Sequence, residues 1–335
     1  MSQLIRSTSR PVLLAALALC AAAAPAATTR VDGLYEAETT FEGGREEAFR
    51  AALKQVLVRL TGRRDAGDRP EVEPLLDNAA AYAQQFSQPA QDSLWVAFDG
   101  AALERELARL GQPVWGAERP TTLLWIAVDA GGGKRFVLAS IEEFEEEAAV
   151  RAELIEAARK RGLPIVFPLL DAEDRGRASF AEVWGGFEDS ILAASERYGV
   201  DAVLVGRLTG DDLGHGRWSL YAFDGAERWS GGAGESIERL ADLFAARFAV
   251  VSSGQSRAVR LAVSGVASVE DYGRISRFLG SLTAVESLGV ESIDGDEIVF
   301  RVALRGESAA LDEAVRLGGL LRPDGSGKLS YRVAR

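Results

Sequence analysis

Five aspartates are the residues of this sequence whose placement could support chemistry. They follow three apolar runs with strand character, at residues 123–128, 165–169 and 202–208. In a parallel sheet the carboxyl ends of such strands meet at one edge, where α/β proteins usually bind ligands. Carboxylates gathered there could hold Mg²⁺ or Ca²⁺, or could supply the acid pair of a glycan hydrolase. The candidate ligand-binding residues are therefore Asp129, Asp171, Asp174, Asp211 and Asp212.

The same aspartates also have an ordinary interpretation. Asp is frequent after strands because its side chain caps helices and hydrogen-bonds turns. The sequence distinguishes no pair among the five. We therefore assign no catalytic residue and no metal ligand, and keep ligand binding at this sheet edge as an alternative.

The side chains that carry other common enzyme chemistry are nearly absent. His215 is the only histidine and stands between two glycines, and Cys20 is the only cysteine. The sequence therefore offers too few residues for a Ser-His-Asp triad, a histidine-rich metal site or a thiol nucleophile. The Gly-Gly-Gly-Lys run at 131–134 lacks the residues that a phosphate-binding P-loop needs at 128 and 135, and is typical of a hairpin turn. We expect a protein without enzymatic activity and without a cofactor.

The aspartates belong to a segment, residues 121–254, in which strands alternate with helices. Helical stretches at 140–161 and 180–198 separate the three apolar runs, and a hairpin follows around Asp224-Gly225. Apolar strands separated by helices indicate a mainly parallel sheet covered on both faces. We predict a central α/β domain at residues 121–254.

An N-terminal α+β segment is predicted at residues 30–112. Apolar side chains at 49, 53, 56, 57 and 60 form one stripe of an amphipathic helix that ends at Thr61-Gly62. A second helix is expected at 70–86, followed by a strand at 94–98 and a helix at 100–110.

The last segment, residues 258–335, has the element order β-α-β-β-α-β. This order predicts a ferredoxin-like domain. The stretches 112–120 and 252–256, rich in Pro, Gly and Ser, are the expected linkers between the three parts. The fold class is therefore mixed α/β and α+β, with several domains.

Three tryptophans are informative about packing. Trp115 lies in the first linker, where we expect it either to be partly exposed or to wedge between domains. Trp218 and Trp229 flank the hairpin, which predicts that they face each other across it.

The first residues indicate where the protein works. Arg6 and Arg10 precede an apolar run that ends in small residues, the pattern of a cleavable signal peptide spanning residues 1–26. Leu19 before Cys20 does not fit lipid attachment, so we do not expect a lipoprotein. No later run is long and apolar enough to span a membrane. We expect a periplasmic protein with no transmembrane segment in its mature chain.

The chain is acidic, with a formal net charge of −12. The predicted cleavage removes two arginines and no acidic residue, which makes the mature charge −14. Such a charge repels nucleic acid and favours partners that present a basic surface. We expect no nucleic acid among the partners; the sequence does not indicate the oligomeric state.

Several motifs together resemble a known bacterial family. These are Val-Leu-Val-Arg-Leu-Thr-Gly at 56–62, Pro-Val-Trp-Gly with Arg-Pro at 113–120, and Gly-Val-Asp-Ala-Val-Leu-Val-Gly-Arg-Leu at 199–208. They resemble the exported-protein family catalogued as domain of unknown function 2066, over nearly the whole mature chain. The resemblance implies export in Gram-negative bacteria, but no activity and no catalytic residues. The central segment also resembles, at the level of fold, α/β modules of periplasmic envelope-assembly proteins.

The function expected from these observations is that of a non-enzymatic periplasmic scaffold or adaptor, associated with the cell envelope and binding other envelope proteins. Two alternatives remain: a binder of a small ligand or peptidoglycan fragment at the central sheet edge, and a hydrolase that uses the five carboxylates named above.

Overall fold

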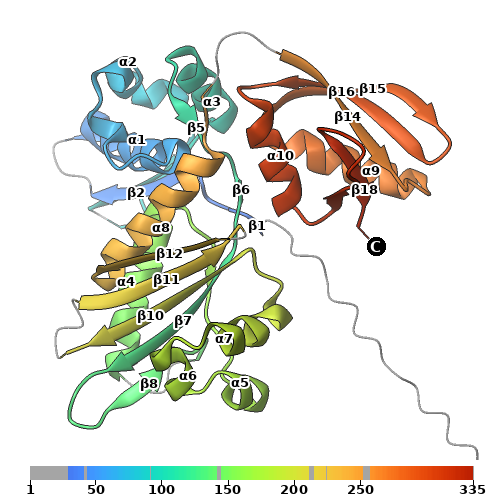
Figure 1. Ribbon diagram of the computed structural model, residues 1–335. Coiled ribbons are helices and arrows are strands. Elements are labelled where there is room, and N and C mark those ends of the chain that lie inside the picture. Colours follow the sequence, from blue (N-terminus) through green and yellow to red (C-terminus); the bar gives the residue numbers. More distant parts are fainter. Residues whose placement is uncertain are drawn as a thin grey trace, which may run out of the picture.

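The computed structural model describes residues 29–40, 44–90, 92–141, 145–210, 215–223, 225–251 and 257–334. The predicted signal peptide with Cys20 lies outside these residues, as do Asp211 and Asp212. The chain is mixed α/β. In Figure 1 the N-terminal part lies at the upper left, the central part below it, and the C-terminal part at the upper right.

The N-terminal part packs around one long helix, α1 (Arg45–Thr61). All five apolar residues of the predicted stripe are buried, with Phe49 the most exposed at 4%. A three-stranded antiparallel sheet, in the order β2-β4-β3, lies beside the helix. The remaining elements are β2 (Glu36–Thr40), α2 (Glu73–Asp77), β3 (Ala83–Ser87), β4 (Ser93–Phe98), α3 (Gly100–Arg109), and the 3₁₀ helices Ala66–Asp68, Pro70–Val72 and Ala79–Tyr82.

The central part contains a six-stranded sheet with the order β12-β11-β10-β7-β8, in which β9 also pairs with β7. Among its described strands, the pairings of β7 with β10 and with β9 are parallel and the others are antiparallel. Its strands are β7 (Thr122–Asp129), β8 (Arg135–Val137), β9 (Ile165–Val166), β10 (Ala202–Thr209), β11 (His215–Ala222) and β12 (Gly225–Gly231). Its helices are α4 (Glu145–Arg161), α5 (Ala172–Arg177), α6 (Phe180–Gly185), α7 (Glu188–Ser195), α8 (Ala233–Phe248) and the 3₁₀ helix Glu196–Tyr198.

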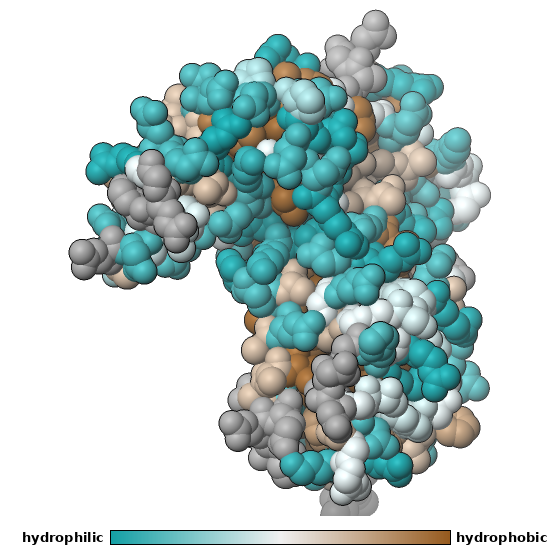
Figure 2. Space-filling view, turned by 90° about the vertical axis from the view of Figure 1, so that its left-hand side faces the viewer, coloured by the Kyte–Doolittle hydropathy of each residue, from teal (hydrophilic) through white to brown (hydrophobic). Residues whose placement is uncertain are grey.

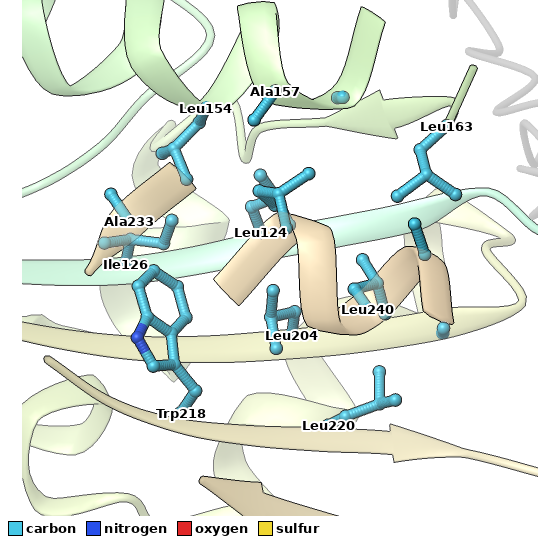
Figure 3. Close-up of a cluster of buried hydrophobic side chains, with 14 of the residues drawn as sticks. Leu124, Ile126, Leu154, Ala157, Leu163, Leu204, Trp218, Leu220, Ala233 and Leu240 are labelled. Carbon is cyan, nitrogen blue, oxygen red and sulfur yellow. The ribbon is translucent and has the colours of Figure 1, made fainter. Parts of the chain in front are cut away.

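Helices cover both faces of this sheet. On one face, residues of β7 and β10 pack against α4 and α8 (Figure 3). Trp218 of β11 points into this layer, where it is 1% exposed, and its indole N–H donates to the carbonyl of Gly231 at 3.0 Å. On the other face, Trp125 packs with residues of α6 and α7. A buried strand such as β7, apolar at almost every position, requires this two-sided cover.

The C-terminal part has its own sheet, in the order β15-β16-β14-β18-β17, and its own buried core. Two helices cover one face of the sheet, and the core lies between them and the strands. The elements are β14 (Arg257–Ser264), α9 (Val269–Ser281), β15 (Val285–Asp294), β16 (Glu297–Leu304), α10 (Ser308–Leu317), β17 (Leu321–Pro323) and β18 (Ser330–Val333).

Several predictions about single elements are wrong. The helix expected at 180–198 is broken at Gly186, where φ is +70°, and Phe187 is 59% exposed instead of sharing the buried face. The end of the helix expected at 70–86 is strand β3, because pairing with β4 outweighs the local pattern. The central sheet is mixed and not mainly parallel, since the hairpins at both ends add antiparallel strands.

The hairpin between β11 and β12 is shifted by one residue from the prediction. Ala222 pairs with Gly225, and Phe223, which follows the last residue of β11, has a φ of +55°. Asp224 itself lies outside the described residues. Trp218 and Trp229 are directly opposite each other, as predicted.

The stretch 112–120 is a buried junction and not a flexible linker. Within it, β5 (Pro113–Val114) pairs with β13 (Val250–Val251), and β6 (Glu118–Arg119) pairs with β1 (Thr29–Arg30). Trp115 between them is 1% exposed, so of its two expected positions partial exposure is wrong, and the side chain is packed within the junction. A short segment therefore contacts distant parts of the chain on both sides.

No helix among the described residues is both long enough and apolar enough to cross a lipid bilayer.

A half-buried carboxyl group just before β10 predicts a pH effect on stability. Asp201 Oδ2 accepts a hydrogen bond from the backbone N–H of Thr121 at 2.7 Å. Burial raises the pKa of Asp201 from its ordinary value of 3.8 to about 6. Between these values the folded state binds more protons than the unfolded state, so the contribution of Asp201 to stability falls as the pH rises from about 4 through 6.

We expect Asp201→Asn to remove this contribution, because the neutral amide oxygen can still accept the Thr121 hydrogen bond. The free energy of unfolding is measured in urea at pH 4.5 and at pH 7.5. The value for the variant minus the value for the wild type should be larger at pH 7.5 than at pH 4.5. The exposed Asp92→Asn variant serves as the control. Parallel pH dependences of Asp201→Asn and the wild type would contradict the prediction.

Candidate functional site: a cationic cleft at an arginine junction

The structure brings two of the predicted aspartates together, at the start of α5. The guanidinium of Arg197 lies between them, with Nη1 2.8 Å from Asp171 Oδ1 and 3.2 Å from Asp174 Oδ1. Asp171 also caps α5 by accepting the N–H of Asp174, and the hydroxyl of Tyr198 donates to Asp174 Oδ2 at 2.5 Å. Both carboxylates therefore already have partners that stabilise local structure.

Asp129 lies at a different place. It is the last residue of β7, and its Oδ2 accepts from Arg135 Nε across the β7–β8 hairpin at 2.8 Å. Asp129 pairs with Thr209, the last residue of β10. Arg197, which binds Asp171 and Asp174, comes before the first residue of β10, at the opposite end of that strand. Figure 1 likewise separates α5 from the β7–β8 turn. The prediction that the described aspartates gather at one sheet edge is therefore wrong: Asp171 and Asp174 lie together, but Asp129 lies apart from them.

The charges around these aspartates do not favour acid catalysis. The hydrogen bond from Arg197 holds the pKa of Asp171 well below its usual range, and the one from Arg135 lowers the pKa of Asp129. A general acid needs the opposite shift, toward the working pH. Within the described part of the chain, no three His, Cys, Asp or Glu side chains gather closely enough to hold a metal ion.

A different arrangement, which the sequence did not suggest, lies where the N-terminal and central parts meet. The C-terminal ends of α1 and α4 come together there. Each helix is followed by a glycine with left-handed backbone, Gly62 with a φ of +68° and Gly162 with a φ of +65°. Helix ends leave backbone carbonyls without partners inside the helix, so this meeting point needs hydrogen-bond donors.

Arg119 supplies those donors. Its side chain is fully buried, and its guanidinium stacks on the Trp115 ring, 3.9 Å from the ring centroid. Arginine has five N–H donors, and here all five bind backbone carbonyl oxygens at 2.7–3.1 Å. The acceptors are the carbonyls of Arg59, Trp115, Gly116, Arg161 and Gly162.

Helix dipoles compensate the buried charge of Arg119. No described carboxylate forms an ion pair with it, but it contacts the C-terminal ends of two helices, each equivalent to about half a negative charge. Burial, together with the nearby charge of Arg59, lowers the pKa of Arg119 to about 9. The side chain therefore remains protonated at neutral pH and joins α1 to α4.

Two further arginines extend the junction. Arg161, 1% exposed, donates to the Gly62 carbonyl at 2.7 Å and forms ion pairs with Glu238 and Asp242 of α8. Arg59, 6% exposed, donates to backbone carbonyls at the start of the N-terminal part. Burial lowers the pKa of Arg59 to about 10, and the charge of Arg159 adds to this effect.

The same junction borders the C-terminal part. The backbone N–H of Gly116 donates to Thr283 Oγ1 at 3.1 Å, and a Cβ at Gly116 would lie only 2.1 Å from that oxygen. Across the α8–α10 contact, Arg247 forms an ion pair with Glu313 at 2.7 Å. One segment of the chain, 113–119, therefore contacts all three parts.

Beside the buried arginines lies a cavity of about 590 Å³. Figure 2, which views the molecule from the side of α1 and β2, shows mainly hydrophilic residues and a narrowing between the upper and lower parts. Five cations line the cavity: Arg59, Arg64, Arg159, Lys160 and Arg161. Three carboxylates line it too: Glu38, Glu156 and Glu238. Asp242 beside the cavity also pairs with Arg64 and Arg161, so a small excess of positive charge remains, which could hold one carboxylate or phosphate group.

The sequence held only partial signals of this site. Both helices end with basic residues and a glycine, which identifies their C-termini. Nothing in the spacing shows that the two ends meet at Arg119, because the donor and its acceptors on α1 and α4 are 42 to 60 positions apart.

Comparison with known families gives one match. Residues 28–116 match the model of a family described as a domain of unknown function (DUF8605). This stretch contains the N-terminal part of the structure up to the junction, and it supports an uncharacterised domain there. A comparison with curated proteins finds no match.

Proposed function

We propose that this protein is an exported, non-enzymatic scaffold or adaptor of the cell envelope that binds other proteins. The observation that carries the proposal is the buried junction, in which one segment contacts the N-terminal, central and C-terminal parts. An adaptor must present its binding surfaces in a constant relative position. A charged hydrogen-bond network that fixes helix ends against each other provides such rigidity.

Other observations support parts of this proposal. Export to the periplasm is proposed from the basic and apolar pattern of residues 1–26 and from the resemblance to the domain of unknown function 2066 family. His215, the only histidine, is exposed at the first position of β11, which is consistent with an ordinary surface residue.

We also propose that the three parts are separate domains and that the C-terminal one is ferredoxin-like. The separate buried cores of the N-terminal and C-terminal parts support the first statement. The second is supported by the strand order, in which the two strands preceding the helices, β14 and β16, lie next to each other at the centre.

The adaptor proposal predicts stable protein partners. The full chain, expressed in its native envelope and chemically crosslinked, should recover the same envelope proteins reproducibly by affinity purification and mass spectrometry. Residue-level mapping should place crosslinks on more than one of the three parts, because a scaffold uses several surfaces. An exported control protein of similar net charge should not recover them.

Recovery of nothing above this control would contradict the adaptor function. That result would favour binding of a small anionic ligand, which we would then place in the cationic cleft and not at the aspartates of the central sheet.

A further inference from the structure

The C-terminal sheet has one covered face and one open face. Leu261 of β14, Phe300 of β16 and Tyr331 of β18 are buried on the side of α9 and α10. Because α10 contacts α8 through the Arg247–Glu313 ion pair, the covered face of the sheet is the one whose helix α10 lies next to the rest of the molecule (Figure 1). Residues one position along each strand point to the opposite, open face.

Four arginines lie on this open face, and they form two pairs that are directly opposite across neighbouring strands. Arg260 of β14 pairs in register with Arg301 of β16. Arg322 of β17 pairs in register with Arg332 of β18. All four are exposed. Arg332 is also in register with Ser264 of β14, which places both pairs on the same side of the sheet. We call these four residues the arginine face.

Only one of the two pairs has an ion-pair partner within the described part of the chain. Glu291 of β15 forms ion pairs with both Arg260 and Arg301. Neither Arg322 nor Arg332 forms an ion pair with any described residue. The nearby carboxylate of Asp324 accepts hydrogen bonds from Ser326, which lower its pKa; the charge of Arg332 adds to this lowering, but the two side chains do not form an ion pair. Like charges directly opposite each other destabilise a sheet, so this second pair works against folding unless an external anion binds it.

The charge of the chain is also unevenly distributed. Residues 257–335 contain eleven basic and eleven acidic residues, so the whole net charge of −12 belongs to residues 1–256. Small side chains lie between the arginines on the open face, among them Ala262, Ala303 and Ser330. They leave a flat surface that an extended backbone can approach closely.

We propose that the arginine face docks an extended, acidic segment of a partner protein. This inference rests on the proposed adaptor function and gives the partner's chemistry. Arg260 and Ser264 are four residues apart on β14, and Arg332 lies level with Ser264 on the neighbouring strand. Arg260 and Arg332, one from each pair, are therefore about 13 Å apart along the strands and one strand spacing apart across them, about 14 Å in all. An extended segment that lies obliquely across these two strands, with acidic residues at positions i and i+4 about 13 Å apart, reaches from Arg260 to Arg332. Guanidinium groups bind carboxylates in a bidentate manner.

A protein segment fits this face better than a membrane does. Surfaces that bind membranes usually combine cations with large apolar side chains that enter the lipid. The side chains between these arginines include no large apolar residue, Val299 being the bulkiest, and the acidic remainder of the chain repels an anionic membrane.

The test uses the full chain and a fluorescent ten-residue peptide of alternating Glu and Thr, with its Gln analogue as the control ligand. We expect saturable binding of the Glu peptide by fluorescence anisotropy, weakened by salt, and at least tenfold weaker binding by the double variant Arg322→Glu/Arg332→Glu. The matched control Arg274→Glu/Arg277→Glu changes two exposed arginines of α9 and should bind within twofold of the wild type. Thermal unfolding checks that both variants fold.

Equal binding of the Glu and Gln peptides, or of the wild type and the Arg322→Glu/Arg332→Glu variant, would overturn the proposal. Binding to phosphatidylglycerol vesicles that exceeds peptide binding and is lost in the same variant would also overturn it, in favour of a membrane. The crosslinking experiment separates the two proposals. If the double variant recovers the same envelope partners as the wild type and the peptide does not bind, the adaptor function stands and the proposed docking role of the arginine face is wrong.

Discussion

Replacing Arg119 with methionine is expected to lower the free energy of unfolding by about 3–5 kcal/mol. Methionine keeps the unbranched apolar stem and has an adaptable shape, but it is two atoms shorter, so the change removes the charge and the five hydrogen bonds and leaves a small space where the guanidinium lay. The backbone carbonyls at the ends of α1 and α4 would lose their donor while buried, and each buried acceptor without a partner costs about 1–3 kcal/mol. Guanidinium denaturation of the full chain measures this loss.

Arg119→Lys separates the two parts of the effect. Lysine keeps the positive charge that the helix dipoles compensate, but its single ammonium cannot reach carbonyls on both helices and beside Trp115 at once. We expect Lys to recover less than half of the loss. Full recovery would show that charge alone holds the junction.

A surface arginine provides the control for this series. Arg109→Met removes an exposed guanidinium that bonds only Glu106 one helical turn away, and it should leave stability nearly unchanged. A loss for Arg119→Met no greater than for this control would contradict the central role of Arg119. Hydrogen exchange gives a second readout, because only the Arg119 variants should speed exchange in the last turns of α1 and α4.

Local sequence patterns correctly predicted those elements whose structure depends on residues close in sequence. The stripe from Phe49 to Leu60 specifies α1 because a helix buries one face and all five apolar residues lie on it. The pairing of Trp218 with Trp229 followed from a hairpin between two strand-like runs, even though its turn was placed one residue too late. In both cases the relevant contacts lie close in sequence.

The candidate site could not be predicted because it depends on distant contacts. The strands before Asp129 and Asp171 are parallel neighbours, as expected, but β9 has only two residues, and α5 follows close after it. The chain therefore turns before Asp171 can reach the far edge of the sheet. Proline and glycine around Arg119 predicted a linker, whereas tertiary packing makes that stretch a junction between all three parts.

The second large effect is expected at Gly62, where the end of α1 approaches α8. The left-handed φ of +68° already disfavours a side chain, by about 1–2 kcal/mol. In addition, a Cβ at this position would lie 2.3 Å from the Cβ of Ala245, a distance at which one helix must shift. Forcing extra volume into a packed contact typically costs about 1–3 kcal/mol. Gly62→Ala is therefore expected to lower the free energy of unfolding by about 2–5 kcal/mol in total.

Two further variants divide this loss into its causes. Gly111 has nearly the same φ, +64°, but no atom of the described residues lies within 4 Å of the place that a Cβ would take, so Gly111→Ala measures the backbone strain alone. The double variant Gly62→Ala/Ala245→Gly removes the clash and leaves the strain, apart from the cost of about 1 kcal/mol for glycine inside α8. Its loss of unfolding free energy should be smaller than the sum of the losses measured for Gly62→Ala and for Ala245→Gly separately. Strict additivity would mean that the two side chains do not meet, and that α1 and α8 are further apart than the junction requires.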